Sequence, residues 1–277
     1  VLASDRFSKA FSACIALLLI VAFTLTSSLL LPTLRADIGE TITVDLHGAG
    51  DFTTIQAAID AASDGDTVYV HEGLYEEDLV IDKIITLSGN GTDLTIINGT
   101  GTGDAATVTS DWVNITALAV SSSRVVGDQP PPFYGGIVLQ GVENCSINSV
   151  RVFDNYGGIV LNNTNNSSVT NVTATGNMGG IVLLSSQANN ITNNNISDNI
   201  AVGMFMTGSN DNLIADNTIV DNGDIGVMGN TSDNNEFRTN GISGSSDNGI
   251  SLEQSDGSLI TDNTVDDCGI GGIELLG

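Results

Sequence analysis

Histidine, cysteine and basic residues are scarce in this chain. Two histidines, three cysteines and seven lysines and arginines occur among its 277 residues, and aromatic residues make up 5%. Because His47 and His71 both precede the repeats that fill the second half of the chain, no metal site of stacked imidazoles can form in those repeats. Three cysteines are too few for a disulfide framework. So few aromatic residues suit a narrow interior filled by stacked aliphatic side chains.

The charge is strongly one-sided, with a net charge of −26. After Ala36 the chain keeps all but one of its 33 acidic residues, and its only basic residues there are Lys83, Arg124, Arg151 and Arg238. Such a surface repels phosphate backbones and anionic membranes, so we expect no nucleic-acid partner. We interpret the acidic residues as a solvated surface, typical of secreted proteins from salt-adapted microbes, archaea especially.

A short motif of one glycine and three mostly apolar residues returns through the second half of the chain. It begins as Gly136-Ile137-Val138-Leu139 and recurs, with loosening sequence, from Gly158, Gly180, Gly203, Gly226, Gly249 and Gly272. The first two intervals are equal, and each later interval is longer by a single position. A nearly fixed period of about 22 to 23 residues is typical of a solenoid, in which each repeat contacts only its neighbours.

Each repeat contains two short apolar runs separated by Asn, Asp, Gly, Ser and Thr. In the glycine motif the first and third residues after the glycine are apolar almost throughout, which predicts a strand with one buried face. The intervening polar residues are turn formers. We therefore predict an all-β, right-handed parallel β-helix of nine or ten coils, spanning residues 37–277.

Polar residues recur as well. One evenly spaced series, which follows the longer repeat, is Asn148, Asn171, Asn194, Asn217, Asn240 and Asn263. A second series is Asn155, Asn177, Asn199, Asn222, Ser245 and Cys268. We interpret both as ladders of side chains that hydrogen-bond from coil to coil. The shorter early repeats shift the register of the first series against the glycines, so a break in one or both series is expected at Asn171.

The first 36 residues resemble an export segment. Arg6 and Lys9 precede an apolar run, 10–31, and cleavage after Ala36 would fit a signal peptide except that Leu34 is larger than usual there. The run is also long enough to span a bilayer, so an uncleaved signal anchor is the alternative and the only expected membrane contact. Either way the protein is expected to be secreted or held at the cell surface.

The remaining cysteines are not expected to pair. Cys145 and Cys268 lie about five coils apart, about 25 Å at about 4.8 Å per coil, which is too far for a disulfide. Both are expected to serve as small core or ladder residues.

The stretch before the repeats predicts a capping helix. Ile55, Ala58, Ile59 and Ala62 share one helical face, and Thr53 with Gln56 fits a capping box. Such a helix would cover the open end of the first coil. We expect the column to continue beyond Gly277, because no capping segment follows the last repeat.

Residues 50–91 resemble the opening of pectin-lyase-like right-handed β-helix proteins, a superfamily that includes pectin methylesterases. The resemblance lies in DFTTIQAAIDAA, GDTVYVHEGLYEE and ITLSGNG. The later repeats resemble those of NosD-like proteins and of carbohydrate-binding and sugar-hydrolase β-helix domains. The resemblance covers roughly residues 45–277, and it implies the fold more strongly than an activity.

The motifs that carry catalysis in such families are missing. Gly73-Leu74-Tyr75-Glu76-Glu77 matches a methylesterase element that we interpret as structural. The paired aspartate contexts and the Gly-Arg-Pro-Trp string of the esterases are absent, as is the Gly-His-Gly of polygalacturonases. No lyase-like set of basic residues is available either.

Four aspartates are the best catalytic candidates that the repeats offer. Asp154, Asp198, Asp221 and Asp267 each precede a residue of the second polar series, and we expect them on successive turns. Two carboxylates stacked one coil apart lie about 5 Å from each other, the separation that retaining glycosidases use. The same pair is able to hold calcium, and an ordinary turn role is the simpler interpretation. We expect no other cofactor. Met178, Met204, Met206 and Met228 cluster in adjacent repeats, but we interpret them as core rather than a copper site.

An aromatic group marks the candidate ligand site. Phe133, Tyr134 and Tyr156 cluster beside an insertion at 121–133, with Arg151 in the same repeat as Tyr156. Tyr134 and Tyr156 are one repeat apart, so they should stack on neighbouring coils, where they would suit a sugar ring. The alternative is that they pack the insertion against the column. Next to them, an outward row of apolar residues, Val138, Val160, Val182, Phe205 and Met228, needs a cover.

Three functions fit these features. The first is an exported, non-catalytic module that binds polysaccharide or cell-envelope glycan through Phe133, Tyr134, Arg151 and Tyr156. The second is a polysaccharide lyase or glycoside hydrolase acting on an acidic plant or algal polysaccharide. The third is a repeat segment of a larger surface or adhesion protein.

Overall fold

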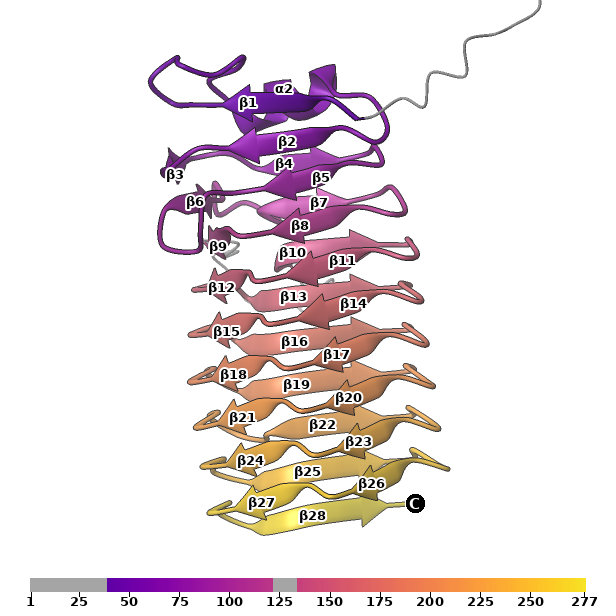
Figure 1. The fold of residues 1–277 in the computed structure, drawn as a ribbon. Helices are drawn as coiled ribbons and strands as arrows, with labels where there is room; N and C mark the ends of the chain where they lie inside the picture. The colour runs from indigo at the N-terminus through magenta and orange to yellow at the C-terminus, as the bar shows by residue number, and fades with distance from the viewer. Residues whose placement is uncertain (1–38, 122–133) are drawn as a thin grey trace, which may run out of the picture. The chain divides into compact units, whose positions relative to one another are not determined.

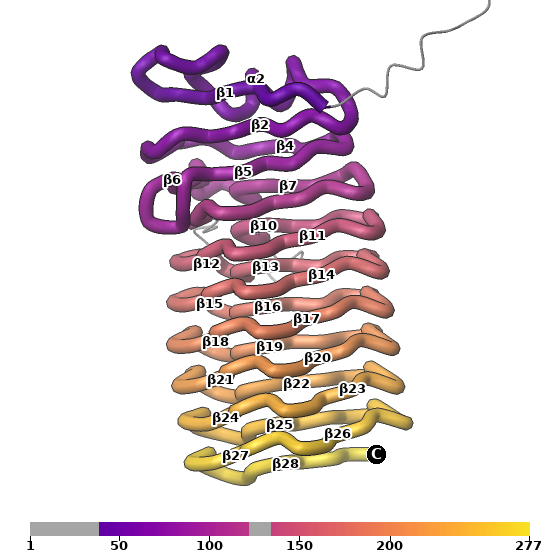
Figure 2. The backbone as a smooth tube through the Cα atoms, in the orientation of Figure 1, coloured from indigo at the N-terminus to yellow at the C-terminus, as the bar shows by residue number. Residues whose placement is uncertain are grey.

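The computed structural model describes residues 39–121 and 134–277, which belong to one compact unit. In this unit the chain winds into a column of stacked coils (Figures 1 and 2). The predicted export segment, together with Phe133 and Arg124, lies outside the described residues. The predicted all-β parallel β-helix with one short helix is confirmed for the part that is described.

Three parallel sheets run along the column, and each complete coil adds one strand to each of them. Sheet A consists of β1 (Thr41–Val44), β2 (Thr67–Val70), β5 (Thr86–Ser88), β8 (Asn114–Thr116), β11 (Ser146–Asn148), β14 (Ser168–Thr170), β17 (Asn190–Thr192), β20 (Leu213–Ala215), β23 (Glu236–Arg238) and β26 (Leu259–Thr261). Sheet B consists of β3 (Gly73–Tyr75), β6 (Thr95–Asn98), β9 (Ala119–Ser121), β12 (Arg151–Phe153), β15 (Thr173–Thr175), β18 (Asn195–Ser197), β21 (Thr218–Val220), β24 (Gly241–Ser243) and β27 (Thr264–Asp266). Sheet C consists of β4 (Leu79–Ile81), β7 (Ala106–Val108), β10 (Gly135–Gln140), β13 (Gly157–Asn162), β16 (Gly179–Leu184), β19 (Val202–Thr207), β22 (Val227–Asn230), β25 (Asn248–Glu253) and β28 (Gly271–Leu276).

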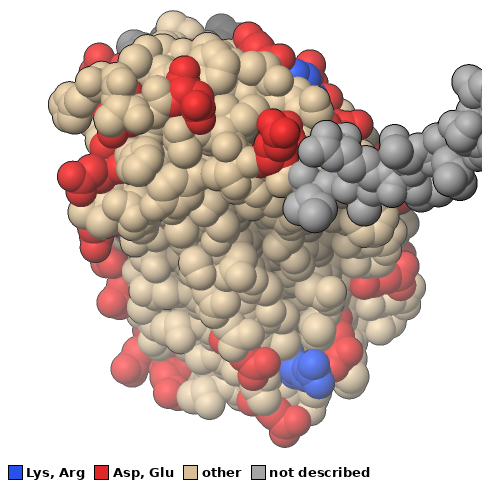
Figure 3. Space-filling view, turned by 45° about the horizontal axis from the view of Figure 1, so that its top comes forward, with Lys and Arg blue, Asp and Glu red and all other residues tan. Residues whose placement is uncertain are grey.

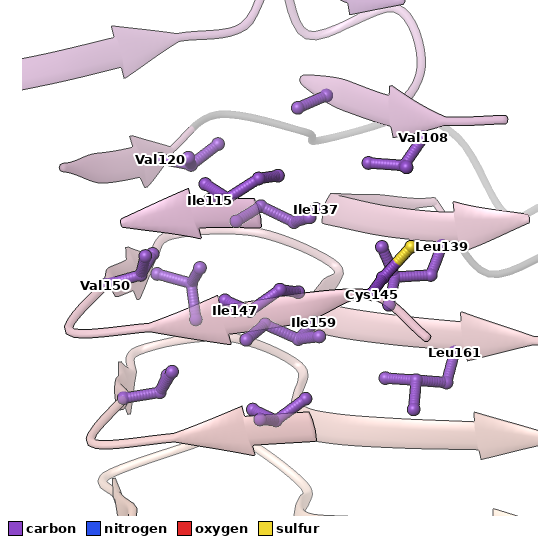
Figure 4. Packing of buried hydrophobic residues seen from close by; sticks show 14 of the residues in the cluster. Val108, Ile115, Val120, Ile137, Leu139, Cys145, Ile147, Val150, Ile159 and Leu161 are labelled. Atoms are coloured by element: carbon purple, nitrogen blue, oxygen red, sulfur yellow. The ribbon is translucent and has the colours of Figure 1, made fainter. Parts of the chain in front are cut away.

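Aliphatic side chains from all three sheets fill the interior of the column. In sheet C, Ile137 pairs with Ile159 and Leu139 with Leu161, so each side chain stacks on its equivalent one coil away (Figure 4). These four side chains are at most 1% exposed. Side chains alternate between the two faces of a strand, so the residues between them point away from this core. The predicted inward positions of the glycine motif are confirmed as far as Leu252, whereas Ile273 and Leu275 of the last strand are 48% and 66% exposed.

Helix α2 (Ile55–Ala61) lies at the N-terminal end of the column, in contact with β1, β2 and β4 (Figure 1). Ile55, Ala58 and Ile59 are fully buried, as the sequence predicts. The predicted capping box is wrong, because the N-cap residue is Thr54 and its side chain makes no capping hydrogen bond. Instead the carboxylate of Glu77 accepts hydrogen bonds from the first two helical N–H groups.

Tyr75 and Glu77, the two key residues of the Gly73–Glu77 element, therefore both make structural contacts. While Glu77 caps the helix, the Tyr75 hydroxyl donates to the carbonyl of His71 at 3.1 Å and lies 3.4 Å from the carbonyl of Val44. Tyr75 itself is fully buried, and burial raises the pKa of its hydroxyl. These contacts agree with the structural interpretation of the motif.

Buried polar ladders hold the corners of the coils. In the second predicted series, Asn155, Asn177 and Asn199 each donate a side-chain hydrogen bond to the next amide along the column, at 2.9–3.1 Å. Each amide oxygen also accepts from the backbone N–H of the preceding member, for example Asn177 Oδ1 from Asn155 N at 3.1 Å. Because buried backbone groups need a partner, the ladder replaces strand pairing where the chain turns.

The first predicted series is correct only from Asn194 onward. Asn194, Asn217 and Asn240 form a buried ladder, whereas Asn171 is exposed and its place in that ladder is taken by Val172, whose N–H donates to Asn194 Oδ1 at 2.9 Å. The coils before Asn194 are one residue shorter than those after it. A series spaced by the longer repeat therefore shifts by one residue, relative to the ladder, at each shorter coil. A further ladder, Asn189, Asn212 and Asn235, was not anticipated.

Neither described cysteine forms a disulfide, as predicted. Cys145 is buried at the start of the Asn189 ladder, where its N–H donates to Ser167 Oγ at 3.0 Å. Burial raises the pKa of its thiol. Cys145 is therefore a structural residue.

Candidate functional site

The chain turns from sheet B into sheet C at one corner of every coil, and this corner carries the predicted aromatic residues. Tyr134 and Tyr156 directly precede β10 and β13, and the N–H of Gly157 donates to the Tyr134 carbonyl at 2.8 Å. They lie on neighbouring coils, as predicted, and both side chains are half-buried.

Met178 continues this column on the next coil. The N–H of Gly179 donates to the Tyr156 carbonyl, and the Met178 side chain is 37% exposed. We call Tyr134, Tyr156 and Met178 the corner column. Sequence reasoning grouped Met178 with the other methionines, although its spacing from Tyr156 equals that of Tyr156 from Tyr134 and places it here.

The outer face of sheet C continues the apolar surface beside the corner column. Val138, Val160 and Val182 form a cluster separate from the core, with Leu184 and Phe205 packed against it. The row was predicted to point away from the core and to need a cover, and the three valines are only 1–3% exposed. We call these five residues the apolar strip.

The strip needs glycine at the start of its strands. A Cβ atom added to Gly157 would lie 2.6 Å from Cγ2 of Val160, and one added to Gly135 would lie 2.7 Å from Cγ2 of Val138. The valine methyl groups therefore occupy the space that a side chain at either glycine would take. This explains why a glycine precedes the repeated glycine motif at both positions.

Arg151 extends from β12 across the outer face of sheet B. Its guanidinium lies 4.5 Å from the centroid of the Phe153 ring, and Nη2 lies 3.8 Å from Oδ1 of Asp93. Its Nε is buried and has no hydrogen-bond partner among the described residues. Phe153 was missed as a site residue, although it follows Arg151 by two positions and so shares its strand face. No sequence pattern linked Asp93 to Arg151, because Asp93 lies two coils before Arg151.

A partly buried carboxyl group lies next to Tyr134. Asp104 Oδ1 accepts from the N–H of Gly135 at 2.8 Å, and Oδ2 accepts from the Thr107 hydroxyl at 3.2 Å. Burial raises the pKa of Asp104, and the nearby carboxylate of Asp78 raises it further. A carboxyl with a raised pKa beside a binding surface is a candidate proton donor or acceptor. Asp104 lies in an irregular turn outside the repeats, so no periodicity pointed to it.

The four predicted aspartates occupy the same corner but do not form a continuous column. Gly176 lies between Asp154 and Asp198, and Gly244 lies between Asp221 and Asp267, so only Asp198 and Asp221 stand on adjacent coils. The expectation of stacking on successive turns is wrong for the others. All four are exposed, with φ between 48° and 56°. This left-handed backbone favours Asp, Asn and Gly, which supports a turn role.

Soft metal ligands do not come together in the described part of the chain. Met204 and Met206 are fully buried inward residues of β19, as predicted, while Met228 lies on the outer face of sheet C. His47 and His71 lie near the N-terminal end of the column. Residues 39–121 and 134–277 contain no group of three or more His, Cys, Asp or Glu side chains able to hold a metal ion. Within the same residues, no helix is long and apolar enough to span a bilayer.

Curated relatives match only part of the chain. The "Probable pectinesterase 8" of Arabidopsis thaliana is 35% identical over 126 residues, which is 40% of this chain and 31% of that protein. A "Pectinesterase/pectinesterase inhibitor" of Ficus pumila var. awkeotsang is 32% identical over 138 residues, which is 44% of this chain and 25% of that protein. The chain thus spans less than a third of the length of either.

Solved structures share the fold at low identity. A pectate lyase has a TM-score of 0.60 and 11% identity, with 78% of this chain and 70% of that one covered. An alginate lyase from Paenibacillus sp. has a TM-score of 0.56 and 16% identity, with 86% and 98% covered. At such identities the likeness concerns the fold alone.

A family model matches almost the whole column. The model described as "Periplasmic copper-binding protein (NosD)" matches residues 59–235 and again residues 116–276. The two matches together span more than half of the chain and follow its repeats from helix α2 to the last strand. The chain therefore belongs to the NosD family of β-helix proteins.

Proposed function

We propose that this protein is an exported glycan-binding module that holds a polysaccharide along the corner column. The observation that carries the proposal is that Tyr134 and Tyr156 occupy the same corner position on neighbouring coils, a series that Met178 continues. Aromatic faces bury the C–H faces of sugar rings, and the coil spacing of about 4.8 Å repeats that contact along a polymer. In the apolar strip only Leu184 and Phe205 are partly exposed, so any further apolar contact would come from these two side chains.

Polar groups at the same corner would orient the ligand. Asp154 lies two residues before Tyr156 and is exposed, and Asp104 lies beside Tyr134. Arg151 extends over the neighbouring face of sheet B. A few polar groups around an apolar surface are the usual composition of a ligand site. The names of the relatives, which include a pectinesterase, a pectate lyase and an alginate lyase, support a polysaccharide as the class of ligand.

Export is part of the proposal. The family description as periplasmic supports it, as does the predicted N-terminal segment. That segment lies outside the described residues, so cleavage or anchoring is tested by N-terminal sequencing of the protein isolated from its host.

Affinity electrophoresis and calorimetry on a panel of soluble polysaccharides test the binding function. Tyr156→Ala is expected to weaken binding about tenfold, since stacking contacts at a buried anchor are typically worth more than about 1 kcal/mol. Tyr69→Ala is the matched control, because Tyr69 is a half-buried tyrosine on sheet A, away from the corner. Equal binding by the Tyr156 and Tyr69 variants would remove the corner column as the site.

Polysaccharide cleavage is the second candidate function, and Asp104 favours it. Its raised pKa suits a general acid or base, and it adjoins the proposed binding surface. Under this alternative, Asp104→Asn abolishes the release of new chain ends while binding persists. Absence of chain cleavage by the unaltered protein over the whole panel would eliminate it.

The copper of the family description does not fit the described residues of this chain. The inward methionines are core, the Cys145 thiol is buried with a raised pKa, and the two histidines lie far from both. Copper sites need soft or imidazole ligands gathered within bonding distance. The proposed function therefore does not involve copper.

A further inference from the structure

We infer that the glycan held at the corner column is uncharged, in contrast to the uronate polymers named for several relatives. This inference rests on the proposed function and specifies its ligand class. It depends on the cationic side chains that the structure describes and on what they already contact.

A polymer of uronic acids carries one carboxylate per sugar. Proteins recognise such carboxylates with Arg or Lys side chains, or through bound cations. Three basic residues occur in the part of the chain that the structure describes, Lys83, Arg151 and Arg238. Each has an intramolecular partner.

The Lys83 side chain is hydrogen-bonded to the capping helix. Its Nζ donates to the carbonyls of Ile59, Asp60 and Ala62 at 2.5–3.0 Å. These carbonyl groups lie at the C-terminal end of α2, where helical hydrogen bonding runs out, although that of Ile59 also accepts from the Ala62 N–H at 3.2 Å. Lys83 therefore stabilises a helix end, and it lies at the N-terminal end of the column rather than beside Tyr156.

Arg238 lies on sheet A, where its Nε is 3.5 Å from Oε1 of Glu236.

Arg151 is the only described cation close to the corner column in sequence and coil position. Its guanidinium lies over Phe153 and faces the Asp93 carboxylate. Its charge is already opposed by a carboxylate, so it offers little attraction to a second one.

The surroundings of the column carry the opposite sign. Asp78, Asp104 and Asp154 all lie at the corner between sheets B and C, and Asp93 lies beside Arg151. On the face shown in Figure 3, acidic side chains are scattered among uncharged ones and basic side chains are few. A polyanion would approach a protein of net charge −26, and such repulsion weakens association.

Calcium does not provide an evident bridge between the acidic protein and an acidic polymer. The described residues contain no cluster of three or more acidic ligands for a metal ion. Carboxylate-lined calcium sites normally use six to eight oxygen ligands, several of them acidic. The inference is therefore tested with and without calcium.

The test compares three classes of polymer on the full chain by affinity electrophoresis and calorimetry. The probes are hydroxyethyl cellulose and galactomannan as neutral polymers, polygalacturonate and alginate as polyanions, and chitosan as a polycation. A neutral polymer is expected to bind, with an affinity that changes less than about threefold between low and physiological salt, because no charge pair forms. Tyr156→Ala should lower that affinity about tenfold.

Chitosan is expected to bind the acidic surface without using the corner. Its binding should fall steeply with salt and should be unchanged in Tyr156→Ala. Chitosan binding that resists salt and depends on Tyr156, with no neutral polymer bound, would overturn the inference.

The results with the polyanions distinguish a failure of the uncharged-ligand inference from a failure of the proposed glycan-binding function. Binding of polygalacturonate or alginate that is lost in Tyr156→Ala would contradict the uncharged ligand but leave the glycan-binding function intact. Testing that binding in Arg124→Gln and after adding calcium or a chelator shows which cation is used. If none of the polymers binds in a Tyr156-dependent way, both the inference and the proposed function fail. Tyr134→Ala and circular dichroism melts guard against misreading a folding defect as lost binding.

Discussion

Glu77 and Ile55 join the first full coil to the capping helix: the Glu77 carboxylate accepts from the backbone N–H of Ile55 at 2.9 Å, and from Gln56 at 3.0 Å. One side chain thus satisfies two of the N–H groups that a helix start leaves unpaired. Since α2 covers the end of the hydrophobic interior, this contact stabilises the fold where it begins.

Glu77→Ala should therefore lower the free energy of unfolding by about 1–2 kcal/mol, the usual effect of losing a helix cap and its charge. Denaturant titration measures it. Glu76→Ala is the control, because Glu76 is exposed and adjacent. Equal stability of the two variants would show that the cap is unimportant.

The central asparagine ladder should be far more sensitive than exposed asparagines. Asn217 donates to the Ile191 carbonyl at 2.8 Å and to Asn240 Oδ1 at 3.0 Å, and its oxygen accepts from the N–H of Asn194. Asn217→Ala leaves these buried groups unpaired, so a loss of about 2–4 kcal/mol is expected.

Asn190→Ala provides the matched control for that measurement. Asn190 is exposed on β17 of sheet A, and its substitution should change stability by no more than about 0.5 kcal/mol. A small effect at both positions would mean that water replaces the ladder at little cost.

The pH dependence of stability should reveal Asp104. Its folded-state pKa is raised above the ordinary value of 3.8, chiefly by burial, so the folded state favours the protonated form. Below pH 3.8 this carboxyl does not lower the free energy of unfolding. The loss of unfolding free energy grows as the pH rises through the pKa of the folded state. Asp104→Asn, which keeps an acceptor for Gly135 N, should be more stable than the unaltered protein at neutral pH.

The same comparison at acid pH supplies the check on Asp104. The stability difference between Asp104→Asn and the unaltered protein should shrink toward zero as the pH falls below 3.8. Urea titrations at a series of pH values measure it. A difference that stays constant with pH would argue against a raised pKa.

Copper binding should be weak and non-stoichiometric. Cu(I) titrated against a chromophoric competitor is expected to stay with the competitor, because Met204 and Met206 are buried and the described residues contain no group of three or more His, Cys, Asp or Glu side chains able to hold a metal ion. Met178→Leu with Met228→Leu tests the two methionines outside the core. One tightly bound copper per chain that these substitutions abolish would reverse our interpretation.

Most of the fold could be predicted from the sequence, because in a β-helix residues that are one repeat apart in the chain become neighbours on adjacent coils. Ile137 and Ile159 are one repeat apart and pair directly, and Tyr134 and Tyr156 follow the same rule. Where the repeat lengthens by a single position, the rule misplaces side chains, and Asn171 lies outside the ladder for that reason.

The candidate site was only partly predictable. Tyr134, Tyr156 and Arg151 could be grouped from their spacing, but Asp93 and Asp104 could not, because both lie in irregular turns that no repeat connects to the site. Alternation along a strand also predicted that the valine row leaves the core and needs a cover, but it could not show what the row meets outside the core.

The sequence by itself thus determined the coil length, the inward face of every repeated strand and the strongly acidic surface, because these follow from periodicity and composition. Only the tertiary structure decided that Glu77 caps the helix, that Asp104 is partly buried beside Tyr134, and that Arg151 is held between Phe153 and Asp93. Those contacts join residues with no common period, so they exist only once the coils have stacked.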